Sequence, residues 1–183
     1  MVHASMNNSF RSTPPIPGEC SDDYQEYVGK VPAGDIIELL MKQGAEAVRL
    51  FSGLTEAQEL FSYMPGKWTV RELLGHVNDD ERLFASRALW FGRGGQGPLP
   101  SWQGDEWVKE NRHSRRPLAD LVNEFEHLRA SSIYLFDSFD EQAWRRHGIA
   151  AGNDVSVRAL VWITAGHVEH HLDILRKRYL SAL

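Results

Sequence analysis

Apolar residues recur three or four positions apart in four separate segments of this sequence, and no other feature constrains the fold as strongly. Such spacing places the apolar side chains on one face of a helix. The segments are residues 34–54, 64–95, 115–139 and 148–180, and no stretch of useful length alternates polar and apolar residues as a strand would. Amphipathic helices bury their apolar faces by packing against each other. The sequence therefore predicts an all-α fold, a four-helix bundle.

Capping residues mark where two of these helices begin. Asp35 precedes helix one, and Thr69 precedes helix two with Glu72 three residues later, which is the pattern of a capping box. Between helices two and three lies a long loop rich in Gly, Pro and Trp, residues 94–116, with a short helix expected around 104–111. If this loop crosses the bundle, helices two and three run in the same direction.

Length and composition predict one domain preceded by a leader. A chain of 183 residues suits a single core. Pro14, Pro15 and Pro17 lie in a stretch of small polar residues, a composition typical of an extended segment. We therefore expect a flexible N-terminal arm over residues 1–22 and the bundle domain over residues 23–183.

Charge, hydropathy and cysteine content argue against several classes of protein. The net charge of −5 provides no broad basic surface for nucleic acid. No apolar run approaches the roughly 18 residues of a membrane-spanning helix. The N-terminus lacks the pattern of a secretory signal, so we expect a cytoplasmic protein that needs no membrane. Cys20 is the only cysteine, so a metal site would have to use histidine and carboxylate ligands.

Two histidines fall on the apolar face of the last helix, which follows a turn at residues 152–154. His167 and His171 share this face with Leu160, whereas His170 lies about 60° to one side. Two imidazoles four residues apart can converge on one metal ion. They can equally be core histidines whose nitrogens are satisfied by hydrogen bonds. The helix alone leaves both interpretations open.

Helix two offers further polar groups close to its buried face. His76 and Asp80 lie one turn apart on one flank of the apolar stripe, and Glu81 lies near its centre. A buried carboxylate needs a partner, and Arg158 on the last helix is a candidate for a salt bridge with Glu81. A third histidine on another helix raises the expectation of a metal site.

Several short motifs together carry a family resemblance. They are Trp68-Thr69-Val70 ahead of His76, Glu81-Arg82, Val155-Ser156-Val157-Arg158-Ala159, and Gly166-His167 with His170-His171. In this combination the sequence resembles the DinB-like (DinB/YfiT) superfamily of metalloenzymes from about Tyr24 to Leu180. The resemblance implies a four-helix bundle of the DinB/YfiT type. It also implies a divalent metal held by one histidine of the second helix and two of the last, here His76, His167 and His171.

Three histidine ligands leave a coordination position open, as in catalytic rather than structural zinc sites. Zinc or nickel is expected there, and iron and manganese also suit imidazole ligands. By analogy with relatives that use low-molecular-weight thiols, we expect a thiol-dependent S-transferase or isomerase. The alternative is a metal-dependent hydrolase, in which Asp80 or Glu81 acts as the base or orients a ligand.

A non-catalytic, metal-binding stress protein is the competing class. A solvent-open pocket above the metal, lined by Trp68, Trp102 or Trp107, favours catalysis, whereas a sealed site favours a structural role. We expect a small-molecule substrate and no nucleic acid or membrane partner. The sequence does not decide whether two copies form a homodimer.

Overall fold

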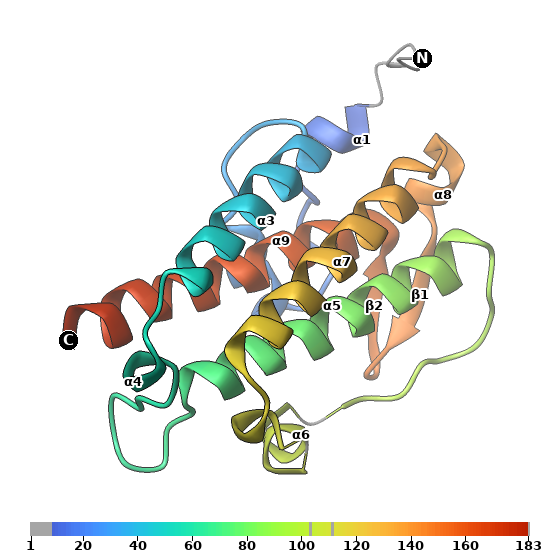
Figure 1. The fold of residues 1–183 in the computed structure, drawn as a ribbon. Coiled ribbons are helices and arrows are strands. Elements are labelled where there is room, and N and C mark those ends of the chain that lie inside the picture. The colour runs from blue at the N-terminus through green and yellow to red at the C-terminus, as the bar shows by residue number, and fades with distance from the viewer. Residues whose placement is uncertain (1–8, 103, 111, 183) are drawn as a thin grey trace.

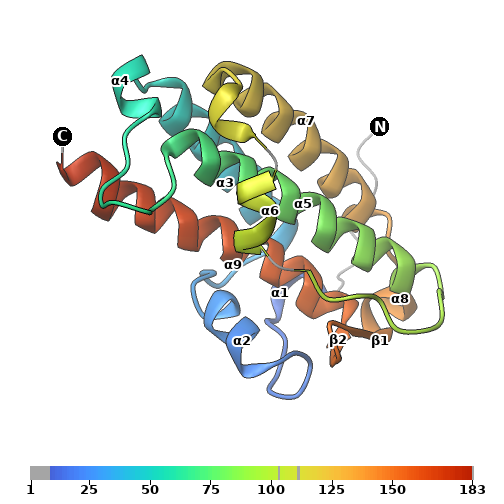
Figure 2. The ribbon, with the colours of Figure 1, turned by 90° about the horizontal axis from the view of Figure 1, so that it is seen from below.

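The computed structural model describes residues 9–102, 104–110 and 112–182, and it is mainly helical. Within these residues four long helices form the bundle: α3 (Ile36–Ser52), α5 (Val70–Gly92), α7 (Leu118–Asp137) and α9 (Val157–Ile174). Both views show α5 and α7 running in one direction and α3 and α9 in the other (Figures 1 and 2). The segment between α5 and α7 therefore crosses the length of the bundle, which is the condition given from sequence for these two helices to run in the same direction. The predicted all-α bundle is confirmed.

Shorter elements connect and cover the bundle. In chain order they are α1 (Ser9–Ser12), α2 (Asp22–Val28), α4 (Glu56–Glu59), α6 (Gly104–Glu110), the 3₁₀ turn η1 (His113–Arg115), α8 (Glu141–Arg145), β1 (His147–Ala150), β2 (Asn153–Ser156), the π turn η2 (Leu175–Tyr179) and the 3₁₀ turn η3 (Leu180–Ala182). Helix α6 is the short helix expected around 104–111, of which residue 111 lies outside the described residues. The last helix, expected to be one unit, continues past Ile174 as η2 and η3.

The predicted helix starts are confirmed at the level of individual hydrogen bonds. Oδ1 of Asp35 accepts bonds from the backbone N–H groups of Ile37 and Glu38, at 2.9 and 3.3 Å. Thr69 and Glu72 form both halves of the capping box that begins α5. These caps satisfy backbone donors that a helix leaves unpaired at its N-terminus, and so they fix the first turn.

An antiparallel hairpin precedes α9, where the sequence analysis found no strand. Strands β1 and β2 pair from His147 opposite Ser156 to Ala150 opposite Asn153. Gly152, at the turn, has a φ of +79°, which glycine adopts without a steric penalty. Each strand has only 4 residues, too few for a polar–apolar alternation to be recognised in the sequence.

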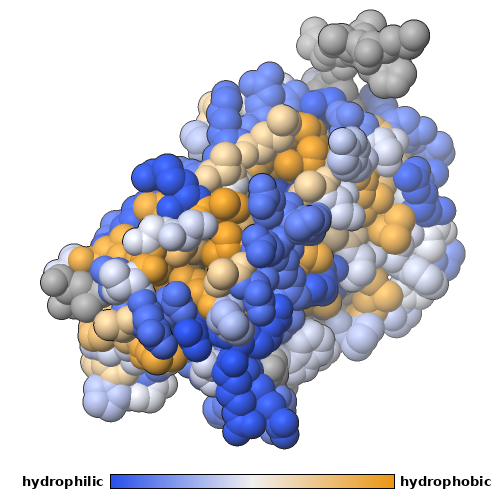
Figure 3. All heavy atoms as spheres, viewed as in Figure 1, coloured by the Kyte–Doolittle hydropathy of each residue, from blue (hydrophilic) through white to orange (hydrophobic). Residues whose placement is uncertain are grey.

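The apolar core is divided into two clusters in the described part of the chain, and the division falls on the histidines. One cluster includes the apolar residues between Val157 and Ala165 of α9 with Phe84 and Phe91 of α5. The other includes Val168 and Leu172 of α9 with the N-terminal part of α5. His167 therefore lies at the junction of the two clusters, where polar side chains are held between apolar ones. On the face seen in Figure 1, hydrophilic residues surround separate apolar patches (Figure 3).

The segment assigned from sequence to an N-terminal arm lies against the bundle from Ser9 onward, and residues 1–8 lie outside the described residues. The backbone N–H of Ser156 donates to the carbonyl of Glu19 at 2.9 Å. Farther along, α2 lies directly on α9: a Cβ added at Gly166 would be 2.0 Å from the carbonyl oxygen of Tyr27. No helix within the described residues is long and apolar enough to span a bilayer.

Candidate metal centre

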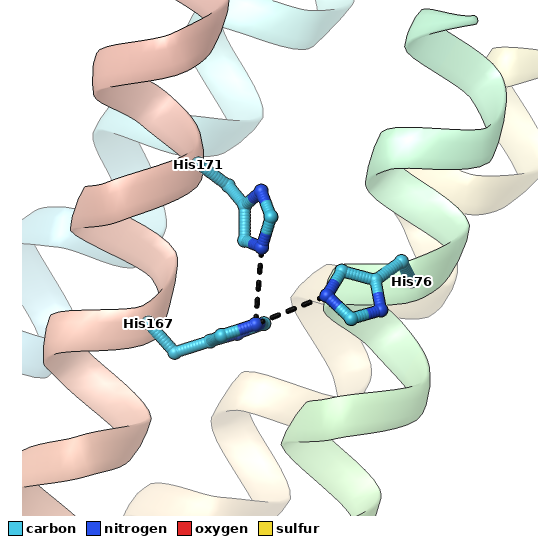
Figure 4. A group of neighbouring side chains, drawn as sticks. All are labelled: His76, His167 and His171. Atoms are coloured by element: carbon cyan, nitrogen blue, oxygen red, sulfur yellow. Dashed lines mark hydrogen bonds between the residues drawn. The ribbon is translucent and has the colours of Figure 1, made fainter. Parts of the chain in front are cut away.

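Three histidines from two helices converge in the bundle interior. His76 comes from α5, and His167 and His171 come from α9 one turn apart (Figure 4). Their exposed fractions are 7, 3 and 6 %. The Nε2 atom of His167 lies 3.1 Å from Nε2 of His76 and 3.0 Å from Nε2 of His171. All three candidate donor atoms lie within 4.8 Å of one another.

The arrangement around His167 fits a shared cation better than it fits hydrogen bonds. Its Nε2 also lies 3.0 Å from Oδ2 of Asp80, so three polar atoms surround one ring nitrogen. A neutral imidazole nitrogen carries either one proton or one lone pair and cannot bond to all three. Zinc–nitrogen bonds of about 2.0–2.1 Å in a tetrahedron place two nitrogens roughly 3.3 Å apart. The donor set therefore suits a divalent metal ion.

Burial keeps the imidazoles in the form that binds metal. It lowers the pKa of His167 well below 6.5, and the neighbouring His171, His76 and His170 lower it further. Burial, followed by His76 and His170, also lowers the pKa of His171 well below 6.5. Neutral imidazoles offer a lone pair, whereas charged ones do not. His167 and His171 are therefore available as ligands at neutral pH.

Asp80 lies beside the triad on the α5 side. It is 2 % exposed, and its Oδ1 lies 3.7 Å from Nδ1 of His76, one turn earlier on the same helix. Burial, followed by the charge of Asp79, raises the pKa of Asp80 to about 9, with Arg87 opposing the shift. A carboxylate at the back of an imidazole can fix which ring nitrogen faces the metal.

Glu81, the other carboxylate singled out from sequence, does not join the cluster. Its two oxygens accept hydrogen bonds from Arg129 of α7 at 3.0 and 2.9 Å, and both side chains are almost fully buried. A salt bridge was expected, but with the wrong partner, because Arg158 pairs instead with Glu19. Arg129 was missed since it lies within the apolar pattern of α7. Arg129 also donates to the carbonyl of Leu40, which joins three helices.

A pocket of about 510 Å³ opens beside the histidines. This volume lies within the usual range for small-molecule sites. Its lining comprises Tyr27, Tyr63, Gly66, Lys67, Trp68, Leu73, His76, Lys109, His170, His171, Ile174 and Tyr179. Sequence reasoning expected Trp68 there. The positions of Tyr27 and of the two lysines in the lining were not predicted. The helix of Tyr27 is too short for a periodic pattern, and the lysines belong to no motif.

The tryptophans surround His76 in different ways. Trp68 lies 4.7 Å from the His76 ring, centroid to centroid. Trp102 stacks on the same ring at 5.7 Å with an interplanar angle of 18°. Trp107 of α6 packs against Trp102 at 5.1 Å. Of the three, only Trp68 lines the pocket, while Trp102 covers the His76 imidazole from the crossing loop and Trp107 packs on Trp102.

His170 takes a position distinct from the triad. It is half-buried and lines the pocket beside His171. Its ring packs edge-on against Tyr27 at 5.4 Å, and Tyr27 makes a similar contact with His167. Helix α2 thus forms one wall of the site. Helical periodicity predicts that His170 lies to one side of the ligand face, and the structure confirms this position.

The crossing loop is fastened to α5 next to the site. His113 is buried, and its Nε2 lies 3.0 Å from Oδ2 of Asp79. A Cβ added at Gly75 would be 2.1 Å from the His113 ring, so only a glycine leaves room for it. Gly75 directly precedes His76. The contact therefore fixes the loop close to one of the three candidate ligands.

Two solved structures resemble this fold over most of its length. YfiT from Bacillus subtilis, described as a probable metal-dependent hydrolase with an unusual four-helix bundle topology, superposes with a TM-score of 0.70 at 14% identity, over 91% of this chain and 93% of that one. The mycothiol-dependent maleylpyruvate isomerase superposes with a TM-score of 0.65 at 21% identity. That match covers 80% of this chain, which spans only 62% of the isomerase. At these identities the likeness establishes the fold.

Sequence comparison identifies the family. A search of curated protein sequences finds no match. The model of the DinB superfamily, in contrast, matches residues 39–175, a range that includes all three histidines of the cluster. Because this match covers most of the sequence and the bundle has the topology that the resemblance implied, the chain belongs to the DinB superfamily.

Proposed function

We propose that this protein is a metal-dependent enzyme that activates a low-molecular-weight thiol, as an S-transferase or an isomerase acting on a small molecule. One observation carries the proposal: the pocket of about 510 Å³ reaches His76 and His171 directly. A purely structural metal site is closed by its protein ligands. An open pocket at the ligands argues for a substrate there rather than for a non-catalytic stress protein.

His76, His167 and His171 would hold the cation. Zinc or nickel is proposed, and iron and manganese also suit three imidazoles. When bound, a divalent cation would lower the pKa of a thiol that enters the pocket, or of water in the hydrolytic alternative.

The chain itself supplies position and shielding. Helices α5 and α9 hold the three imidazoles. Asp80 lies at the back of His76, on the side of Nδ1, and also contacts Nε2 of His167 on the ligand side, so that it can orient both rings. Trp68 and Tyr27 form apolar walls that exclude water from one side of a ligand. Glu81 is engaged with Arg129, so we assign it to the stability of the bundle rather than to chemistry.

The lining of the pocket favours a thiol over water as the activated group. Among the described residues that line it there is no aspartate or glutamate that could act as a base. A free thiol has a pKa of about 8.5 and bulk water one of about 15.7, so a thiol needs less assistance. The isomerase that resembles this fold is named for a thiol, mycothiol.

Hydrolysis is the second candidate, supported by the likeness to YfiT, which is described as a probable metal-dependent hydrolase. In that case Asp80, which contacts His167 but does not line the pocket, would act as the base or orient a ligand. A cytoplasmic location stays a prediction. Size-exclusion chromatography with light scattering would measure whether two copies of the chain form a homodimer.

The decisive experiment combines metal analysis with a turnover screen. Protein purified without an affinity tag is analysed for bound metal, then assayed with several thiols against electrophilic substrates and separately with ester and amide substrates. We expect about one metal ion per chain and thiol-dependent turnover that His167→Ala abolishes. His127→Ala, which removes an exposed histidine of α7, is the matched control and should keep both. Turnover of esters without any thiol would replace the first proposal by the second.

A further inference from the structure

We infer that the pocket beside the histidines selects a small organic anion, and that Lys67 and Lys109 are the residues that recognise its oxyanion group. This inference rests on the proposed function for the location of the reacting atoms. It adds the chemical class of the substrate, which neither the triad nor the fold specifies.

The two lysines reach the pocket from different segments. Lys67 precedes Trp68 in the connection between α4 and α5, and Lys109 belongs to α6 of the crossing loop. Both are exposed, and neither has an ion-pair partner among the residues whose side chains the structure describes. Lys42 and Lys177 differ in this respect, because each pairs with a carboxylate one turn away, at 3.6 and 3.0 Å.

The charge of the pocket contrasts with that of the protein. The chain carries a net charge of −5, yet the described lining residues include two lysines and no carboxylate. The nearby Asp173 is already bonded to Lys177 at 3.0 Å. A concave surface bearing one sign of charge concentrates ligands of the opposite sign. An anion entering this pocket would therefore meet two ammonium groups that have no ion-pair partner among the side chains that the structure describes.

The remaining lining indicates the body of the ligand. Trp68, Tyr63, Leu73 and Ile174 present aromatic and aliphatic surface. The position of Trp68 is fixed, since Tyr179 donates a hydrogen bond of 2.7 Å to its carbonyl oxygen. A rigid apolar wall next to two cationic groups fits a molecule with a flat or apolar body and a carboxylate or phosphate.

Calorimetric titration tests this without depending on turnover. The probes are phenylacetate, phenyl phosphate and the neutral phenylacetamide, each added to metal-loaded and to metal-stripped protein at low ionic strength. The variants are Lys67→Met, Lys109→Met and both together, with Lys42→Met as the matched control. All these lysines are exposed, so the fold should tolerate the changes.

We expect at least one anion to bind about tenfold more tightly than the amide in both metal states. Each single substitution should weaken that binding about threefold and the double substitution about tenfold, as for exposed charge pairs. Lys42→Met should leave it unchanged, and added salt should weaken it. Comparing the two anions tells whether the group is a carboxylate or a phosphate.

Three results would overturn the inference: no binding of either anion, equal binding of the amide, or anion binding that the double substitution leaves intact. Anion binding that requires the metal and is unchanged by the lysine substitutions would be an example of the third result. If His167→Ala loses metal but keeps lysine-dependent anion binding, the inference stands. A failure of the proposed function can thus be distinguished from a failure of the anion assignment.

Discussion

The Asp80 carboxylate lies against the His167 imidazole, with Oδ2 3.0 Å from Nε2, although Asp80 belongs to α5 and His167 to α9. Both side chains are almost fully buried, so water does not compete for the contact. The same carboxylate lies one turn from His76 on α5. Asp80 therefore connects the two helices that supply the triad.

Replacing Asp80 by asparagine should weaken metal binding about 10- to 100-fold, the usual effect of removing a group that orients a ligand. The fold should persist, because asparagine fills nearly the same volume. Competition with a chromogenic chelator measures the affinity. Asp120→Asn, at an exposed position of α7, serves as the control. Equal affinities in the two variants would remove Asp80 from the site.

Metal removal should lower the thermal stability of the protein. A ligand present at 100 times its dissociation constant stabilises the folded state by about 2.7 kcal/mol. Stripping the wild type with a chelator should therefore lower its melting temperature by several degrees, and adding metal should restore it. His171→Ala should keep its helical circular dichroism but show no response to metal. A stabilising response in that variant would contradict the triad assignment.

Glu81→Gln should reduce the free energy of unfolding by about 3–5 kcal/mol, because it leaves the buried Arg129 guanidinium without its counter-charge. Metal content, measured well below the melting temperature, should stay at the wild-type level. The comparison is Glu141→Gln, which breaks an exposed pair with Arg145 and should cost less than about 1 kcal/mol. Loss of metal without loss of stability would return Glu81 to the site.

Gly166→Ala should displace α2 from α9. The added Cβ would meet the backbone of Tyr27 at 2.0 Å, and backbone cannot move aside as a side chain can. Overpacking of this kind costs about 1–3 kcal/mol. Limited proteolysis within residues 9–35 should become faster. In Gly53→Ala, where the nearest atom lies at 3.5 Å, the rate should match that of the wild type.

Low pH should weaken the contacts through which Glu19 attaches the N-terminal segment to the start of α9. Its burial would raise the carboxyl pKa, but hydrogen bonds from Arg158, Ser156 and the Ile16 backbone outweigh this, and the pKa is lowered below 4.5. A group with a lowered folded pKa stabilises above its unfolded pKa, and this stabilisation disappears as pH falls through the folded value.

Melting temperature against pH measures this contribution. Between pH 6 and pH 3 the wild type should lose more stability than Glu19→Gln, with a difference of about 2 kcal/mol at pH 6, typical of hydrogen bonds to a charged group. Identical pH profiles for the two proteins would show that Glu19 does not stabilise the segment.

The parts of the fold predicted from sequence are those with a local cause. Asp35 and Thr69 begin helices because each can bond the next turn, and this depends on neighbours in the chain. The predicted partner of Glu81 was wrong because the actual partner depends on how α7 packs against α5, which no local sequence pattern indicates. The hairpin at 147–156 was missed for a related reason, since its short strands are held by pairing with each other and with Leu99.

The residues of the candidate site also divide into those that a local pattern predicts and those that it does not. Helical periodicity predicted that His167 and His171 lie together. His76 was assigned to the same site from its place beside the apolar stripe of helix two and from the family resemblance. Lys67, Lys109 and Tyr27 were not found, because they lie in a connection, a short loop helix and the segment before the bundle. Their proximity results from tertiary packing, which only the three-dimensional structure supplies.

The three imidazoles come from only two helices, and this affects which metal ion the site prefers. Two donors are fixed relative to each other by a single turn of α9, so one remaining variable, the separation of α5 from α9, sets the width of the donor triangle. Ions of different radius require different widths. Helix α2 contacts both helices, because its Tyr27 backbone lies against Gly166 of α9 and its Tyr24 ring packs edge-on against Phe84 of α5 at 6.0 Å. Substitutions at these contacts should therefore change which cation is preferred, without touching a ligand.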